Sequence, residues 1–184
     1  MMKTTQLKKA FPKTGYDPGA SSLKIHLWYL TSSLLFKSGL MPWSTVLVSV
    51  LRLYGARIGK DVRIKPYIDI KYPWKLTVGD HSWLANCLIE NLDEVVIGNH
   101  VCVSQHAMLL TGNHNYRKST FDLVTASIVL EDGVWICAKA TVCPGTRAKT
   151  HSMLTVGSVA TRDMEDYMIY QGNPARTKSK RTIE

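Results

Sequence analysis

The sequence predicts an all-β protein: a parallel β-helix of six-residue repeats, with a helical N-terminal segment and one protruding loop. Three observations predict it. Aliphatic residues recur every six positions, an apolar stretch without that period precedes them, and a polar stretch interrupts them. A period of six fits neither an α-helix nor strands joined by hairpins, but it fits a short strand followed by a corner. We therefore expect a helical segment over residues 1–54, a β-helix over 55–165 with a loop at 111–127, and a C-terminal tail over 166–184.

The N-terminal segment contains an apolar stretch, residues 23–54, which is interrupted by Lys37, Gly39 and Pro42. Each apolar half is shorter than the roughly 20 residues that cross a bilayer, so we expect two helices. They would cap the open end of the β-helix, which otherwise exposes apolar side chains and unpaired strand groups. The alternative is a peripheral membrane contact, with three aromatic residues at the level of the lipid headgroups: Trp28, Tyr29 and Trp43.

The six-residue period is clearest in the second half of the chain, where every sixth residue is aliphatic: Leu130, Ile136, Val142, Ala148, Leu154 and Ala160. Four positions after each of the first five stands a small or β-branched residue: Val134, Ala140, Thr146, Ser152 and Ser158. We expect the aliphatic side chains to point inward and each coil to be buried by its neighbours. Glycines recur beside the aliphatic residues, where we expect turns whose backbone conformation side chains resist: Gly59, Gly79, Gly98, Gly133, Gly145 and Gly157.

The period lapses in the polar stretch from Thr111 to Arg117, which continues through Phe121 and Asp122. Excursions from a rigid scaffold are where function tends to lie. The chain has six histidines, and His114 is the one in this excursion. Since histidine titrates near physiological pH and can accept a proton from a hydroxyl group, we predict that His114 is a general base.

The composition indicates one main domain, because 184 residues are too few for two enzymatic domains with linkers. The hydrophobic fraction of 45% and the charged fraction of 20% are typical of a soluble protein. The four cysteines include no CxxC pair, so we expect free thiols in a reducing cytoplasm rather than a zinc site or a disulfide framework. The lysine-rich start lacks the cleavage site of a secretory signal, which also favours the cytoplasm. No nucleic-acid motif accompanies the net charge of +9, so we expect no nucleic-acid partner.

Two Ile-Gly-x-x-Val segments, Ile58 to Val62 and Ile97 to Val101, resemble those of the hexapeptide-repeat acyltransferases. The coils of that family wind left-handed, so the resemblance implies a left-handed parallel β-helix. Four further segments resemble the colanic-acid-type exopolysaccharide acetyltransferases: Ile70-Lys71-Tyr72-Pro73-Trp74, Ile97-Gly98-Asn99-His100-Val101, Leu110-Thr111-Gly112-Asn113-His114 and Tyr170-Gln171-Gly172-Asn173-Pro174-Ala175. The resemblance extends from about Trp28 to Arg176.

The resemblance implies that an acetyl group moves from acetyl-CoA to a saccharide hydroxyl in exopolysaccharide biosynthesis, with His114 as general base. Asn86 matches an asparagine that orients the acceptor, and the alternative is a corner asparagine that bonds its own backbone. We expect Asn113 and Tyr116, of the same loop as His114, to contact the acceptor. The positions that line the CoA groove in the family are Trp135, Ala138, Val156, Thr161, Arg162 and Arg176. In the family this groove lies between neighbouring β-helices, so a homotrimer is implied. A lipid-linked acceptor would suit a protein at the inner face of the membrane.

The sequence departs from the family pattern at three places. Asn115 stands where many sugar acetyltransferases have proline directly after the catalytic histidine. Cys137 replaces a glycine, and Ala148 with Lys149 replaces an Ile-Gly pair. These changes concern acceptor placement and local turn geometry rather than the fold.

Two other functions compete with acetyl transfer. A γ-type carbonic anhydrase needs histidines stacked coil upon coil, yet 18 residues after His81 stands Asn99, and 18 after His106 stands Val124. We therefore expect no metal. No cysteine lies in the loop beside His114, so a covalent acyl-enzyme is not expected. A non-catalytic β-helix scaffold, or a membrane-associated binding protein, stays open from the sequence.

Overall fold

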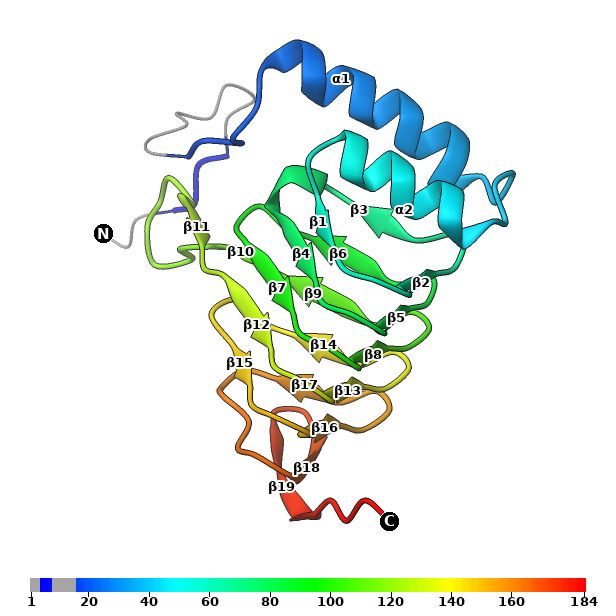
Figure 1. Cartoon of the computed structure of the whole chain (residues 1–184). Helices are drawn as coiled ribbons and strands as arrows, with labels where there is room; N and C mark the ends of the chain where they lie inside the picture. The colour runs from blue at the N-terminus through cyan, green and yellow to red at the C-terminus, as the bar shows by residue number, and fades with distance from the viewer. Residues whose placement is uncertain (1–3, 8–15) are drawn as a thin grey trace.

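The structure is a computed structural model that describes residues 4–7 and 16–184. Figure 1 shows a stack of β-coils with two helical segments over one end and a hairpin at the other. The strands of the coils pair in parallel, and β10 (Gly112–His114) with β11 (Leu123–Thr125) forms a separate antiparallel pair outside the stack. The predicted left-handed parallel β-helix of hexapeptide repeats is confirmed.

Three sheets form the sides of the β-helix. Sheet A contains β1 (Arg57–Ile58), β4 (Leu76–Val78), β7 (Val95–Ile97), β12 (Ile128–Leu130) and β15 (Arg147–Ala148). Sheet B contains β2 (Arg63–Ile64), β5 (Trp83–Leu84), β8 (Cys102–Val103), β13 (Trp135–Ile136), β16 (Met153–Leu154), β18 (Met168–Gly172) and β19 (Ala175–Lys180). Sheet C contains β3 (Asp69–Ile70), β6 (Leu88–Glu90), β9 (Met108–Leu110), β14 (Thr141–Val142) and β17 (Val159–Ala160).

The interior of the β-helix is filled by the two series of residues that the six-residue period predicts. No member of the aliphatic series from Leu130 to Ala160, or of the small series from Val134 to Ser158, is more than 2% exposed. Burial of one large aliphatic side chain contributes about 1.5 to 3 kcal/mol. Because each coil shields the next, that contribution depends on the whole stack.

The sequence predicts a turn conformation that side chains resist at six glycines. The prediction is confirmed at three of them and is wrong for the other three. Positive φ angles occur at Gly133 (+69°), Gly145 (+79°) and Gly157 (+68°). The other three lack this conformation, but an added Cβ would lie between 2.2 and 2.6 Å from a side-chain oxygen of the next coil: Gly59, Gly79 and Gly98. There glycine is required by the close approach of two coils, which the sequence pattern alone does not reveal.

The N-terminal helical segments are α1 (Ser22–Thr31), η1 (Ser32–Lys37) and α2 (Ser44–Leu53), and Figure 1 shows them above the first coil. The Ser21 side chain caps α1 by accepting a hydrogen bond from the Lys24 backbone N–H. Trp28 is fully buried and donates from Nε1 to the backbone oxygen of Ile70 at 3.0 Å, which joins α1 to the coils. The helices therefore cover the apolar end of the stack.

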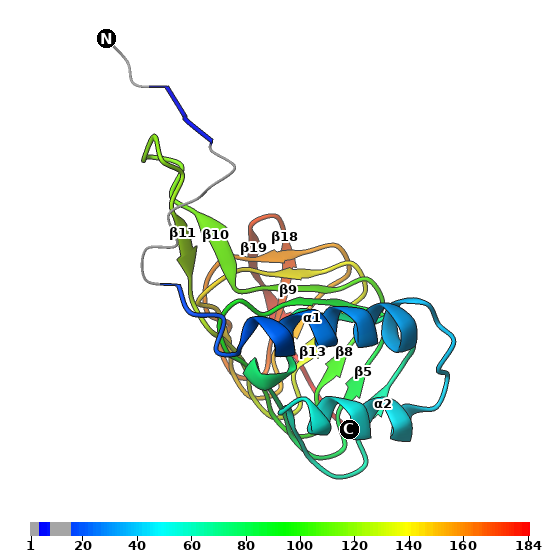
Figure 2. The same ribbon diagram turned by 90° about the horizontal axis from the view of Figure 1, so that it is seen from above.

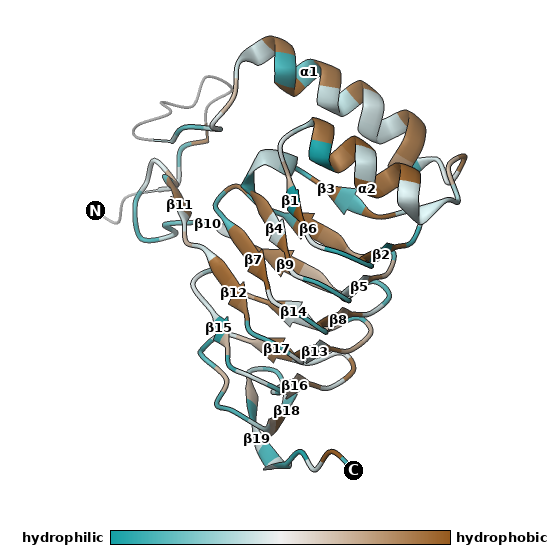
Figure 3. Ribbon diagram, viewed as in Figure 1, coloured by the Kyte–Doolittle hydropathy of each residue, from teal (hydrophilic) through white to brown (hydrophobic). Residues whose placement is uncertain are grey.

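The outer surface of α1 and η1 is also apolar. Four exposed leucines follow one another at helical spacing: Leu23, Leu27, Leu30 and Leu34. Figure 3 shows apolar residues in brown along these helices. Within the described residues, no helix has the length and apolarity that a membrane span requires.

The other end of the stack is a hairpin rather than an unstructured tail. Strands β18 and β19 pair antiparallel, and β18 also continues sheet B beside β16. Tyr170 on β18 is buried and its hydroxyl accepts a hydrogen bond from the Glu165 backbone N–H at 3.0 Å. In the part of the chain that the structure describes, a short 3-10 helix, η2 (Pro73–Lys75), is the remaining helical element.

Candidate active site

The polar loop leaves sheet C after β9 and returns to sheet A at β12, and Figure 2 shows it protruding beside the coils. Thr111 anchors its base: the buried hydroxyl donates to the Glu90 backbone oxygen at 2.9 Å and accepts from the Asp93 backbone N–H at 2.9 Å. Beyond this anchor, β10 and β11 pair residue for residue, with His114 opposite Leu123. The loop is thus an ordered hairpin with a fixed base.

His114 is exposed on this hairpin and is oriented by Phe121. Its Nδ1 lies 2.8 Å from the Phe121 backbone oxygen, and the two rings stack with centroids 4.5 Å apart. Phe121 has a φ of 53°, an uncommon conformation for a residue with a side chain, and it aims the carbonyl at the histidine. Since a carbonyl oxygen can only accept, Nδ1 carries the proton and Nε2 carries the lone pair of the neutral ring.

Four of the other histidines lie at corners of the coils with φ between 55° and 58°: His81, His100, His106 and His151. Histidine is among the residues that tolerate this left-handed conformation. The fifth, His26, contacts the Ser22 backbone oxygen within α1 through Nδ1 at 2.6 Å. The other five histidines therefore lie at corners of the coils or in α1, and His114 is the one on the protruding loop.

The predicted acceptor residues do not form one cluster within a single chain. The side-chain oxygen of Asn113 accepts a hydrogen bond from the backbone N–H of His114 at 2.8 Å, and Tyr116 is 75% exposed on the loop. Asn86 lies between β5 and β6, at the corner joining sheets B and C, where its Nδ2 is 3.4 Å from Nε2 of His106. The loop of His114 joins sheets C and A, which is a different corner of the coil.

Three of the predicted CoA positions line one groove on the outer face of sheet B: Trp135, Ala138 and Val156. The groove has a volume of about 430 Å³. Trp135 is fixed at its edge, because Nε1 donates to the Ser104 hydroxyl at 2.9 Å. Sequence reasoning missed Ser104 and Lys178, which also line the groove. Ser104 could have been found, since it follows the inward Val103 and must point outward.

The two predicted arginines lie in another hollow, of about 200 Å³, beside the C-terminal hairpin. Arg162 and Arg176 line it together with Tyr170, and the Arg176 guanidinium donates to the backbone oxygen of Ala175 at 3.2 Å. Thr161 is exposed next to this hollow without lining it. The six predicted CoA positions thus occupy two hollows and one exposed site on the C-terminal coils.

Two of the four cysteines, Cys87 and Cys137, are poor nucleophiles in these surroundings. Burial raises the pKa of Cys87 to about 12 and the pKa of Cys137 to about 11. Both thiols therefore stay protonated near neutral pH. Across residues 4–7 and 16–184, no group of three or more His, Cys, Asp or Glu side chains is placed to hold a metal ion.

The chain is similar to several acetyltransferases, although no protein-family model matches it. It is 32% identical over 161 residues to WcaF of Escherichia coli, which is named as a colanic acid biosynthesis acetyltransferase; the match covers 85% of this chain and 87% of WcaF. It is 29% identical over 140 residues to a galactoside O-acetyltransferase of Lactococcus lactis, covering 72% and 67% of the two chains.

Solved structures share the fold. A hexapeptide-repeat acetyltransferase of Vibrio cholerae, complexed with acetyl coenzyme A, superposes with a TM-score of 0.78 at 22% identity, covering 89% of this chain and 92% of the other. A maltose O-acetyltransferase of Clostridium difficile gives a TM-score of 0.79 at 20% identity, covering 89% and 90%. The identity to WcaF along most of both chains, together with the β-helix, shows that the protein belongs to the hexapeptide-repeat acetyltransferases.

Proposed function

We propose that the protein transfers an acetyl group from acetyl-CoA to a saccharide hydroxyl, with His114 as the general base. The observation that carries this proposal is the contact between Nδ1 of His114 and the Phe121 carbonyl, because it gives Nε2 the lone pair that a base needs. The similarity to WcaF and to a galactoside O-acetyltransferase supports a saccharide acceptor in exopolysaccharide biosynthesis.

The reaction is a direct transfer. Nε2 of His114 takes the proton from the sugar hydroxyl while the hydroxyl oxygen attacks the thioester carbonyl and forms the new C–O bond. The C–S bond then breaks, and the leaving CoA thiolate takes the proton from the imidazolium ring. General-base catalysis of this kind contributes about 10²- to 10⁴-fold, and the positioning of two substrates contributes much of the rest. The raised pKa of Cys87 and of Cys137 agrees with a route that needs no acyl-enzyme.

We place acetyl-CoA along the groove of sheet B, against Trp135, Ala138 and Val156. The lining of the groove comes from β13, β16, both strands of the hairpin and the residues that follow β8, so the groove crosses several neighbouring strands. Arg162 and Arg176, with Thr161 beside them, lie at the C-terminal end, where guanidinium groups would meet the phosphates of CoA. Among the neighbours in the fold, the Vibrio cholerae protein is complexed with acetyl coenzyme A and a galactoside acetyltransferase with coenzyme A.

The placement of the acceptor residues favours a site shared between copies of the chain. Asn86 and His114 lie at different corners of the coil, so one chain presents the asparagine while a neighbour presents the histidine, Asn113 and Tyr116. A cyclic trimer then makes three equal sites from one kind of contact. The assembly is testable by light scattering, which should give three times the 20.6 kDa of one chain.

A peripheral contact with the inner face of the membrane would bring this site to a lipid-linked acceptor. The exposed leucines of α1 and η1 supply the apolar surface. Between Pro18 and Lys60 the sequence has five basic residues and no acidic residue, which suits an anionic lipid surface. Leu27→Ser with Leu30→Ser should lower binding to vesicles of phosphatidylglycerol and phosphatidylcholine in sedimentation, whereas retained binding would contradict the contact.

The decisive experiment for the proposed function is an acetyl-transfer assay with purified protein, labelled acetyl-CoA and a panel of saccharides. Mass spectrometry should find an acetyl ester on the acceptor, and the surface polysaccharide of cells without the gene should lose one. A non-catalytic scaffold is the competing reading. It should give no heat when acetyl-CoA is titrated into the protein, so the binding measurement separates the two.

A further inference from the structure

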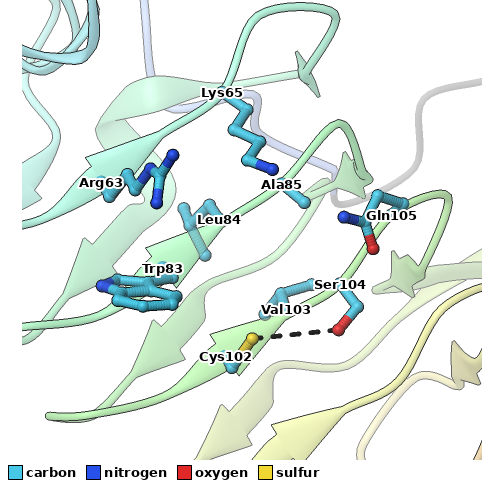
Figure 4. Close-up of a pocket in the computed structure, with 9 residues that line it drawn as sticks. All are labelled: Arg63, Lys65, Trp83, Leu84, Ala85, Cys102, Val103, Ser104 and Gln105. Atoms are coloured by element: carbon cyan, nitrogen blue, oxygen red, sulfur yellow. Dashed lines mark hydrogen bonds between the residues drawn. The ribbon is translucent and has the colours of Figure 1, made fainter.

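A second pocket lies on the same face of sheet B, toward the helical end of the stack, and no role proposed above uses it. The pocket has a volume of about 240 Å³. Figure 4 shows the residues that line it. Its lining comes from three neighbouring strands, β2, β5 and β8, and from the residues that follow them. Ser104 and Gln105 line both this pocket and the groove assigned to acetyl-CoA, so the two hollows adjoin.

The pocket carries two cations on one side. Arg63 and Lys65 flank Ile64, which is buried in the core, and both side chains therefore point outward. Figure 4 shows them side by side above Leu84 and Ala85. No carboxylate lines the pocket, and neither cation forms an ion pair with any residue in the described ranges.

Several other cations of the β-helix are paired with carboxylates. Arg147 lies 2.6 Å from Glu131, and Lys71 lies 2.7 Å from Glu90. Two adjacent positive charges without a carboxylate repel each other. They form a positive site that an anion could occupy.

An exposed tryptophan completes the pocket. Trp83 is 55% exposed beside Arg63, whose guanidinium lies 5.6 Å from the centre of the ring. A flat indole held on a strand presents an apolar surface on which the C–H face of a sugar ring can pack. The guanidinium beside it can donate two parallel hydrogen bonds to a phosphate group.

We propose that this pocket binds the diphosphate of the acceptor, so that the saccharide accepted by the enzyme is linked to a diphosphate. This inference rests on the proposed acetyl transfer to a saccharide. Ala85 of the pocket directly precedes Asn86, so a sugar attached to the bound diphosphate lies at the asparagine assigned to the acceptor. On the other side the pocket adjoins the groove for acetyl-CoA, and donor and acceptor meet on one face.

The test is calorimetry on the full-length protein saturated with CoA, using four probes. They are inorganic pyrophosphate, UDP-glucose as a nucleotide-linked sugar, farnesyl-diphospho-glucose as a lipid-linked sugar, and neutral methyl glucoside. At least one diphosphate-linked sugar should bind about tenfold more tightly than methyl glucoside, and pyrophosphate should compete with it. Which of the two sugars binds identifies the source of the diphosphate. Equal affinity for methyl glucoside and both diphosphate-linked sugars would overturn the proposal.

Matched variants locate the site. Arg63→Gln with Lys65→Gln should remove the preference for diphosphate-linked sugars and raise the acceptor KM without changing the KM for acetyl-CoA. Arg57→Gln with Lys60→Gln, at two exposed cations on and directly after β1 of sheet A, makes the same change of two charges elsewhere and should preserve the preference. A rise in the KM for acetyl-CoA in the double variant would assign the cations to the donor and sink the proposal. Absence of acetyl transfer to every sugar, with diphosphate binding intact, would instead refute the proposed function alone.

Discussion

In the stacked coils, each inward side chain has a counterpart one coil above and one below, as Ile97 lies in register between Val78 and Leu130. In the excursion 111–127 the chain leaves this arrangement and is held by local contacts. A change inside a coil therefore disturbs two neighbours, whereas a change in the excursion leaves the stack intact. The comparison teaches that the repeating part specifies the shape of the molecule and that the non-repeating part is free to carry the reacting group.

The excursion nevertheless has its own order. Asp122 accepts a hydrogen bond from Lys118 at 2.8 Å, and the Asn115 backbone N–H donates to the Asp122 backbone oxygen at 2.8 Å. The Lys118 side chain lowers the pKa of the Asp122 carboxyl group. Because that pKa is lower in the folded protein, the contact stabilises the folded protein above the ordinary carboxyl pKa. This stabilisation is lost as the pH falls through the lowered pKa.

The largest effect is expected from a charge placed inside a coil. Ile97→Asp buries a carboxylate at a position that is 1% exposed, and we expect it to cost several kcal/mol or to prevent folding. Val96→Asp is the matched control, since the adjacent residue of β7 is 37% exposed. Thermal unfolding followed by circular dichroism measures both. Equal melting temperatures for the two variants would contradict the inward and outward assignment.

The next effect tests the chemistry of the excursion. His114→Ala should lower kcat by at least about 100-fold, because the base is lost, while the melting temperature stays close to that of the parent. Steady-state kinetics and thermal unfolding on the same samples give both numbers. His106→Ala, at a corner of the coils beside Asn86, is the control. If it does the greater damage to kcat, the base is misassigned.

A smaller effect is expected from Phe121, which orients the proposed base. Phe121→Ala removes the ring stacked on His114 and should lower kcat by about 2- to 10-fold, since such aromatic pairs contribute about 0.5 to 1.5 kcal/mol. Phe121→Tyr keeps the ring and should restore the rate. Steady-state kinetics with each substrate varied in turn give kcat and KM for both variants. An unchanged kcat in the alanine variant would show that Phe121 does not position His114.

The smallest effect concerns the C-terminal coils. Arg176→Ala should raise the KM for acetyl-CoA several-fold and change the acceptor KM less, because one exposed charge-assisted contact is lost. Initial rates with each substrate varied in turn provide the comparison. A monomer of about 20 kDa in light scattering that retains full activity would contradict the shared site, whatever the arginine does.

The sequence predicted the parts of the site whose positions follow from the repeat or its interruption. It indicated that Trp135 lies on a coil and that His114 lies on an excursion, and the structure has both. It missed Phe121, although an aromatic residue in a polar loop was a visible signal. Phe121 contacts His114 through its backbone oxygen, and the direction of a backbone carbonyl cannot be predicted from the type of residue.

What the sequence by itself determined is the inside of the molecule. The period of six identifies the buried series, because a residue that must be apolar in every coil repeats in the chain. Only the tertiary structure decided how closely neighbouring coils approach and which side chains meet on their outer faces. Stacking explains why Gly98 must be glycine, since the next coil occupies the place of its Cβ. It also brings Arg63, Trp83 and Ser104 into one pocket, although 41 positions separate the first from the last, because parallel coils align residues that the chain keeps far apart.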